Sequence, residues 1–220
     1  MLDHVLNLGN QLSTDLVKSD NFPKFNYDRM LVVGMGGSGV SGDVLQLVLN
    51  KYSPVDIEVH KTYKITKKHI ENKPLCLFIS YSGNTEETVS ALEEAINADL
   101  EWCVISSGGT LLELAKENSK PYIEIPSGLQ PRAAFGLMTK AVASFTPESF
   151  GVNIVENCND AGFYINKLLD NESENEIIKR SKEIANNIGN KTVIIYAGTK
   201  LSYLASQRWK TQINENAKSK

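Results

Sequence analysis

Three hydroxyl side chains lie close together after a strongly apolar segment. The segment PLCLFIS at 74–80 leads into YSGNTEE, so Ser80, Ser82 and Thr85 come just before a predicted helix at 85–98. A phosphate monoester is bound well by many short donors that converge on its three oxygens, and free N–H groups at a helix start add to them. Hydroxyls that only cap the helix would account for one of the three. The spacing therefore favours a phosphate site.

A second candidate loop is rich in glycine. Residues 34–39 read GMGGSG, which matches the pattern GxGxxG between an apolar run and a predicted helix. Glycines let backbone N–H groups approach an anion, and a helix N-terminus favours negative charge. Three readings stay open: a tight turn, a dinucleotide site with Glu58 as the ribose-binding acid, or another phosphorylated or sugar ligand, contacted by Gly36, Gly37 and Ser38. The loop that carries Ser80, Ser82 and Thr85 (the hydroxyl loop) favours the last of these readings. A dinucleotide site does not require such a loop.

Two charged residues complete the set of candidates. Arg132 follows Pro131 at the start of a predicted helix. An arginine there suits an anionic ligand, although a solvated surface residue is the other reading. Glu215 lies near the end of the last predicted helix, where a glutamate taken alone reads as a solvated charge.

The elements that must position these loops alternate between strand and helix. The strands are predicted within five apolar runs: RMLVVG, VDIEVHK, PLCLFIS, EWCVISS and PYIEIP. Helices are predicted at 40–49, 85–98, 111–118 and 132–145. This alternation predicts an α/β fold with a parallel, doubly wound sheet of five strands and helices on both faces. Nearly continuous apolar strands fit burial on both faces. We adopt the flavodoxin-like strand order by analogy.

Two helix starts have the spacing of a capping box. Asn84 and Glu87 have it at the helix 85–98, and Thr110 and Glu113 have it at the helix 111–118. We therefore expect each pair to cap its own helix.

The pattern changes near residue 150. Residues 155–188 read as two helices joined by the turn DNESENE, followed by the strand NKTVIIYAG at 190–198 and a helix at 201–214. A strand with one helix is the opening of a second α/β unit, because an isolated strand leaves its backbone groups unpaired. We expect a first domain at 1–150, with an amino-terminal helix at 3–18. A helical connector and an incomplete second domain would follow at 151–220.

Composition excludes several classes of function. The 220 residues carry a net charge of −3 without a basic stripe, which argues against a nucleic-acid partner. No run approaches the roughly 18 apolar residues of a membrane span, and no leader is recognisable. The cysteines and histidines lack metal-ligand spacing, and the cysteines read as reduced thiols; they are Cys76, Cys103, Cys158, His4, His60 and His69. A cytoplasmic protein without a metal is expected.

The loops together resemble a known family. GMGGSGVSGD at 34–43 followed by SYSGNTEET at 80–88 resembles the phosphosugar-binding signature of the SIS (sugar isomerase) domain. The segment SSGG at 106–109 fits the same pattern. GLQPR at 128–132 resembles the PRxA segment of the archaeal-type bifunctional phosphoglucose/phosphomannose isomerases. QRWKTQINENAK at 207–218 resembles the RWKxxxNENAK stretch in the second SIS unit of the same enzymes.

The resemblance implies an activity and a site. The activity is an aldose–ketose isomerisation that interconverts fructose 6-phosphate with glucose 6-phosphate and mannose 6-phosphate through an enediol, without a cofactor. Glu215 would be the catalytic base, and Arg132 would help the oxygen that gains charge. Substrate would be bound by the loop residues Gly36, Gly37, Ser38, Ser80, Ser82, Thr85 and Arg132. Hexose 6-phosphates and a second copy in a homodimer are the expected partners.

The sequence also departs from the family. Family members use a histidine just downstream of the base and a lysine near the carboxyl terminus, and neither is found in this sequence. The chain is therefore expected to be a carboxyl-terminally truncated member.

Two other functions stay open. A non-catalytic SIS module that senses a phosphosugar would need the loops around Ser38 and Ser82 but not Glu215. An NAD(P)-binding oxidoreductase would use the GxGxxG segment and would not depend on the hydroxyl loop.

Overall fold

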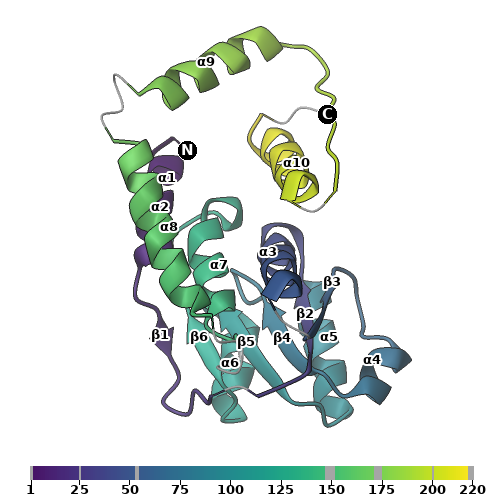
Figure 1. Cartoon of the computed structure of the whole chain (residues 1–220). Helices are drawn as coiled ribbons and strands as arrows, with labels where there is room; N and C mark the ends of the chain where they lie inside the picture. Colours follow the sequence, from purple (N-terminus) through teal and green to yellow (C-terminus); the bar gives the residue numbers. More distant parts are fainter. Residues whose placement is uncertain are drawn as a thin grey trace.

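The centre of the fold is one mixed sheet. The computed structural model describes residues 2–24, 26–52, 55–146, 152–170, 175–199 and 201–217. The described residues form a six-stranded sheet with the strand order β1-β6-β5-β4-β2-β3 (Figure 1). The strands are β1 Val17–Lys18, β2 Arg29–Gly34, β3 Asp56–His60, β4 Leu75–Ile79, β5 Trp102–Ser106 and β6 Tyr122–Glu124.

The predicted parallel strands are all present, in the expected order. Neighbours among β2 to β6 are parallel, and across the sheet they run β3-β2-β4-β5-β6. Numbered along the chain this order is 2-1-3-4-5, which is the flavodoxin-like order. The expected total of five strands is wrong, because β1 pairs antiparallel with β6. This short strand covers an edge of β6 that would otherwise expose unpaired backbone groups.

Helices cover both faces of the sheet. Alternate residues of β2 belong to two buried clusters, with Met30 and Val32 in the first and Leu31 and Val33 in the second. The first cluster lies under α3 and α7, and the second under α5 and α6, which confirms the doubly wound arrangement. Among the described residues, no helix has the length and apolar character needed to cross a membrane. The bounds are α3 Gly36–Tyr52, α4 Lys67–Asn72, α5 Glu86–Asn97, α6 Gly109–Glu117 and α7 Phe135–Ala143.

The amino-terminal segment differs from the single helix predicted at 3–18. It forms two short helices, α1 Leu2–Leu6 and α2 Leu8–Ser13. Helical structure ends there because the following residues join the sheet as β1. Helix α2 packs against α8 (Ile154–Leu168), and a Cβ atom placed on Gly9 would lie 2.5 Å from the carbonyl oxygen of Gly162.

The carboxyl-terminal region confirms the predicted helices but not the predicted strand. Helix α8 is followed by α9 (Glu176–Ile188), α10 (Leu201–Gln212) and a π-helical turn at Ile213–Ala217. The strand predicted at 190–198 is wrong: the segment joins no ladder with the described strands, and Tyr196 is exposed. Apolar residues favour a strand, but a strand forms only with a partner. The proposed boundary near 150 falls at 147–151, outside the described residues, so the division into 1–150 and 151–220 stays a prediction.

Candidate active site

Four loops meet at the carboxyl edge of the parallel strands. Gly34 pairs with Ile79, Ile79 pairs with Ile105, and Ser106 pairs with Glu124. Because these pairs end their strands together, the loops that follow β2, β4, β5 and β6 leave the sheet along one edge. The chain leaves β2 toward α3 on one face and β4 toward α5 on the other, which makes this edge a topological switch point. Ligands bind at such a point in open α/β sheets.

The hydroxyls of the loop after β4 lie close together. The Oγ atom of Ser80 lies 2.8 Å from Oγ1 of Thr85 and 3.5 Å from Oγ of Ser82. Ser80 is buried, whereas Ser82 is exposed and Thr85 is half-buried. Thr85 occupies the N-cap position of α5, but its side chain makes no capping hydrogen bond. The hydroxyls therefore stand at a helix start without serving to cap that helix.

The loop after β5 holds the hydroxyl loop in place. Gly83 has a φ of +73°, and a Cβ atom there would lie 1.8 Å from the carbonyl oxygen of Gly108. The side chain of Asn84 accepts hydrogen bonds from the N–H (3.0 Å) and the hydroxyl (3.1 Å) of Thr110. Both predicted capping boxes are therefore wrong, because these side chains bind each other across two loops. The close contact leaves room only for glycine at position 83.

The glycine loop at 34–39 lies beside two other segments. Gly34 pairs with Ile79, which directly precedes the hydroxyl loop, and the turn that contains Arg132 lies on the other side. Helix α3 begins at Gly36, whose φ is +50° and whose Cβ position is open. A Cβ atom on Gly37 would lie 3.5 Å from the carbonyl oxygen of Pro131. The hydroxyl of Ser38 is buried against α7, 3.5 Å from the sulfur of Met138. We therefore expect a ligand to meet Ser38 through its backbone N–H rather than through its hydroxyl.

Arg132 and Glu215 lie together although they are far apart in the sequence. Arg132 belongs to a 3₁₀ turn at Pro131–Ala133, and Glu215 belongs to the π-helical turn after α10. Nη1 of Arg132 lies 3.8 Å from Oε2 of Glu215, and Nε of Arg132 donates to Oδ1 of Asn216 at 2.8 Å. The Glu215 side chain is 48% exposed, so it is open to a ligand. Acid and guanidinium therefore face one another beside the glycine loop.

Sequence reasoning did not select Tyr81, which links two of the loops. Its buried hydroxyl donates to the carbonyl oxygen of Pro126 at 2.9 Å and accepts from the N–H of Leu129 at 2.8 Å. The hydroxyl loop is thereby tied to the segment that leads into Arg132. A tyrosine inside the motif SYSGNT was the available signal, but its partners lie 45 and 48 residues away.

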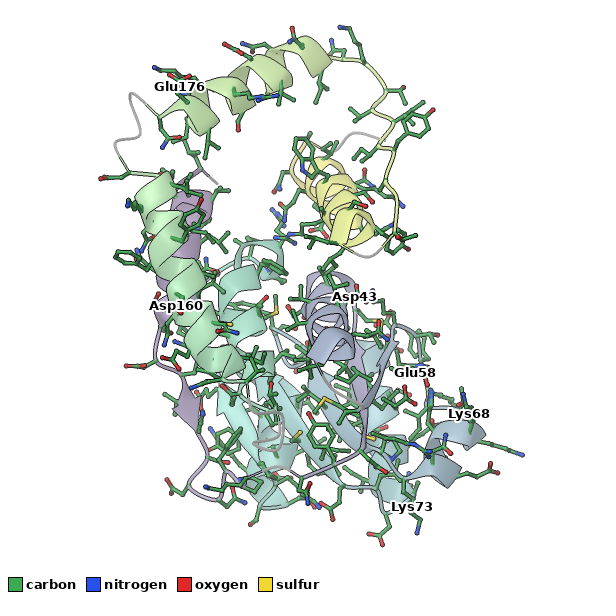
Figure 2. The ribbon with its side chains drawn as sticks, viewed as in Figure 1. Asp43, Glu58, Lys68, Lys73, Asp160 and Glu176 are labelled. Atoms are coloured by element: carbon green, nitrogen blue, oxygen red, sulfur yellow. The ribbon has the colours of Figure 1, made fainter. Side chains whose placement is uncertain are left out.

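The carboxylate of Glu58 is already hydrogen-bonded within the protein. It lies within β3, and Figure 2 shows it on the same side of the molecule as Lys68 of α4. Its Oε1 lies 2.9 Å from Nε2 of the buried His69, and this hydrogen bond lowers the pKa of Glu58. A ribose-binding acid would be free at the end of its strand, so the geometry counts against the dinucleotide reading.

Comparison with known proteins agrees with this architecture. Residues 25–118 match the SIS domain, and residues 177–220 match the bacterial phospho-glucose isomerase C-terminal SIS domain. A bifunctional phosphoglucose/phosphomannose isomerase from Caldicellulosiruptor bescii is 32% identical over 232 residues, which cover 100% of this chain and 66% of that protein. A D-glucosamine-6-phosphate 4-epimerase from Sulfolobus acidocaldarius is 32% identical over 194 residues, covering 87% of this chain and 58% of that protein.

Solved structures support the same fold. The C-terminal domain of glucosamine-fructose-6-phosphate aminotransferase from Francisella tularensis superposes with a TM-score of 0.67 at 17% identity, covering 97% of this chain and 66% of that one. At this identity the likeness concerns the fold alone.

The fold and these matches define the class of protein. The chain belongs to the SIS-domain proteins. Within that class it is related to the bifunctional phosphoglucose/phosphomannose isomerases, which confirms the resemblance read from its motifs. The chain spans 66% of the relative from Caldicellulosiruptor bescii.

Proposed function

We propose that this chain carries the phosphosugar-binding and proton-transfer groups of an isomerase that interconverts fructose 6-phosphate with glucose 6-phosphate and mannose 6-phosphate. The observation that carries the proposal is the pairing of Arg132 with Glu215, 3.8 Å apart, next to the glycine loop. Moving a proton between neighbouring carbons needs a carboxylate that reaches both, and positive charge for the oxygen of the enediolate. This pair supplies both groups.

The phosphate would be held at the hydroxyl loop. Ser80, Ser82 and Thr85 offer converging hydroxyls at the start of α5, and Gly36 and Gly37 add backbone N–H groups at the start of α3. Helix N-termini favour anions. Glu86 and Glu87 in the first turn of α5 oppose this, so the short hydrogen bonds must dominate. Fixing the non-reacting phosphate lets its binding energy position the reacting carbons.

The proton transfer would run through Glu215. Its carboxylate takes a proton from the first carbon of open-chain fructose 6-phosphate, and the electrons form the enediolate, whose oxygen lies near the guanidinium of Arg132. A proton then passes from the first oxygen of the enediolate to the second, and Glu215 returns its own proton to the second carbon, on one face for glucose 6-phosphate and on the other for mannose 6-phosphate. Opening the sugar ring needs an acid–base group that we assign to no residue of this chain. Action in the cytoplasm as a homodimer is part of the proposal, on the strength of the family resemblance.

A second candidate is a phosphosugar-binding module without turnover. The match to the general SIS domain, at 25–118, includes the hydroxyl loop. Glu215 lies in the separate match at 177–220, and Arg132 lies in neither match. A module that only binds a phosphosugar would need the first of these segments alone.

Turnover distinguishes the two candidates. The purified, folded chain is offered fructose 6-phosphate, and glucose 6-phosphate and mannose 6-phosphate are measured. Glu215→Gln should reduce turnover about 10²- to 10⁴-fold, as loss of a general base does. Glu176→Gln makes the same change at an exposed site on α9 and should have no effect (Figure 2). A folded chain that binds fructose 6-phosphate without turnover would support the second candidate. Glucosamine 6-phosphate, named for the epimerase relative, is the comparison substrate.

A further inference from the structure

Helix α10 holds the backbone of Arg132 with two side chains. Nη2 of Arg208 donates to the carbonyl oxygen of Arg132 at 2.8 Å, and Nε2 of Gln212 donates to the same oxygen at 3.2 Å. Residues four apart lie on one face of a helix. A single carbonyl of the Arg132 turn therefore fixes that face of α10 against the loop.

The same helix end also holds the side chain of Arg132. Oε1 of Gln212 accepts a hydrogen bond from Nδ2 of Asn216 at 2.6 Å, and Oδ1 of Asn216 accepts from Nε of Arg132 at 2.8 Å. Together with the Gln212–Arg132 bond these contacts close a ring. Each amide uses its donor on one side and its acceptor on the other, so neither can rotate without breaking a bond.

The side chain of Arg208 also packs on an aromatic ring. The guanidinium of Arg208 lies 4.6 Å from the ring centroid of Phe135, which follows the Arg132 turn at the start of α7. Arginine stacks on aromatic faces in this way. Burial lowers the pKa of Arg208, whereas the nearby Glu215 raises it. Arg208 thus places a second positive charge near the proposed base.

We propose that Arg208, Gln212 and Asn216 are positioning residues that hold the Arg132 guanidinium opposite the Glu215 carboxylate. Asn216 directly follows Glu215, so the bond between Asn216 and Arg132 sets the base and its partner in one geometry. The inference rests on the proposed function, because it assigns these residues to the same proton transfer.

Steady-state kinetics of Gln212→Met test the inference. Methionine keeps the length of the side chain but removes both amide bonds. We expect kcat to fall about 10- to 100-fold, because small displacements of reacting groups cost this much, while KM stays within about twofold because the phosphate loop is intact. Gln207→Met makes the same change on α10 at a residue without a hydrogen bond to Arg132 among the described contacts, and should behave as wild type. An unchanged kcat for a folded Gln212→Met would overturn the proposal.

A double-mutant comparison separates positioning from simple stability. In an Arg132→Ala background, Gln212→Met should add no further loss of kcat, since nothing remains to be positioned. Losses that multiply instead would show that Gln212 acts apart from Arg132, which contradicts the inference.

An NMR measurement keeps the inference testable without turnover. The Nε–H signal of Arg132 in an NMR spectrum, assigned by its absence in Arg132→Lys, should be shielded from solvent exchange in the wild type. It should exchange faster in Gln212→Met and in Asn216→Ala. If the wild type shows this shielding but no turnover, the proposed function fails, and the ring of hydrogen bonds around Arg132 is structural only. If the signal is unprotected in the wild type, the positioning inference fails by itself.

Discussion

The pairing of Arg132 with Glu215 is the feature on which the proposed chemistry depends. Arg132 lies in the middle of the chain and Glu215 near its carboxyl end, yet their side chains meet at 3.8 Å. Glu215 by itself has the sequence environment of an ordinary solvated glutamate. Only its contact with Arg132, and the resemblance of QRWKTQINENAK to a catalytic segment, single it out.

Arg132→Lys tests the guanidinium at constant charge. Lysine keeps the positive charge but cannot offer the planar fork that binds Asn216 and faces Glu215 together. We expect turnover of fructose 6-phosphate to fall about 10²- to 10³-fold, as for the loss of a preorganised donor. Arg180→Lys on the exposed face of α9 is the matched control and should be silent. Equal turnover in Arg132→Lys and wild type would show that charge alone suffices.

Several elements have a geometry that depends on contacts between residues far apart in the sequence, and these contacts could not be predicted. Buried parallel strands could be predicted because each is a nearly continuous apolar run, whereas the apolar periodicity at 3–18 predicted one helix where the structure has two. The capping of α5 and α6 could not, because Asn84 binds Thr110 across two loops. The two-residue β1 has no signal of its own and forms because β6 has an open edge. The strand at 190–198 was predicted from composition and is absent because it has no described partner.

Gly83→Ala should disrupt the junction between the hydroxyl loop and the loop after β5. The added Cβ would lie 1.8 Å from the carbonyl oxygen of Gly108, so backbone must move. At Gly36 the φ is also positive but the space is open, so Gly36→Ala should cost only about 1–2 kcal/mol of backbone strain. Urea unfolding should therefore show a larger loss of stability for Gly83→Ala. A smaller loss for Gly83→Ala than for Gly36→Ala would contradict the packing described for these loops.

The contact between β3 and α4 predicts a pH dependence. The hydrogen bond with His69 lowers the pKa of Glu58, so this carboxylate stabilises the fold above its unfolded value of 4.5. That contribution is lost as the pH falls through the lower, folded pKa. Glu58→Gln should therefore be less stable than wild type at neutral pH, and the difference in the free energy of unfolding should shrink below pH 4.5. A difference that stays constant with pH would exclude an ionised Glu58 from this role.

At the scale of the whole molecule, the sheet protects its thiols. Burial raises the pKa of Cys76 to about 12 and that of Cys103 well above its usual range, so both stay neutral at ordinary pH. Because they lie in β4 and β5 at the centre of the sheet, a thiol reagent at pH 8 should reach them only through global unfolding. Mass spectrometry should find both unmodified in the native chain and modified in urea. Rapid labelling of either in the folded chain would contradict the buried core.

In the proposed function, a phosphate site at the carboxyl edge of the parallel strands acts together with a base, Glu215, from the π-helical turn after α10. Incorporation of solvent deuterium tests this most directly, because it follows the proton that Glu215 is proposed to move. Fructose 6-phosphate is incubated with the chain in D₂O, and deuterium at its first carbon and at the second carbon of the aldose products is followed by NMR. We predict incorporation with the wild type and with Glu176→Gln, and none above background with Glu215→Gln. Incorporation at the same rate in Glu215→Gln, or its absence in a wild type that binds the sugar phosphate, would contradict the account.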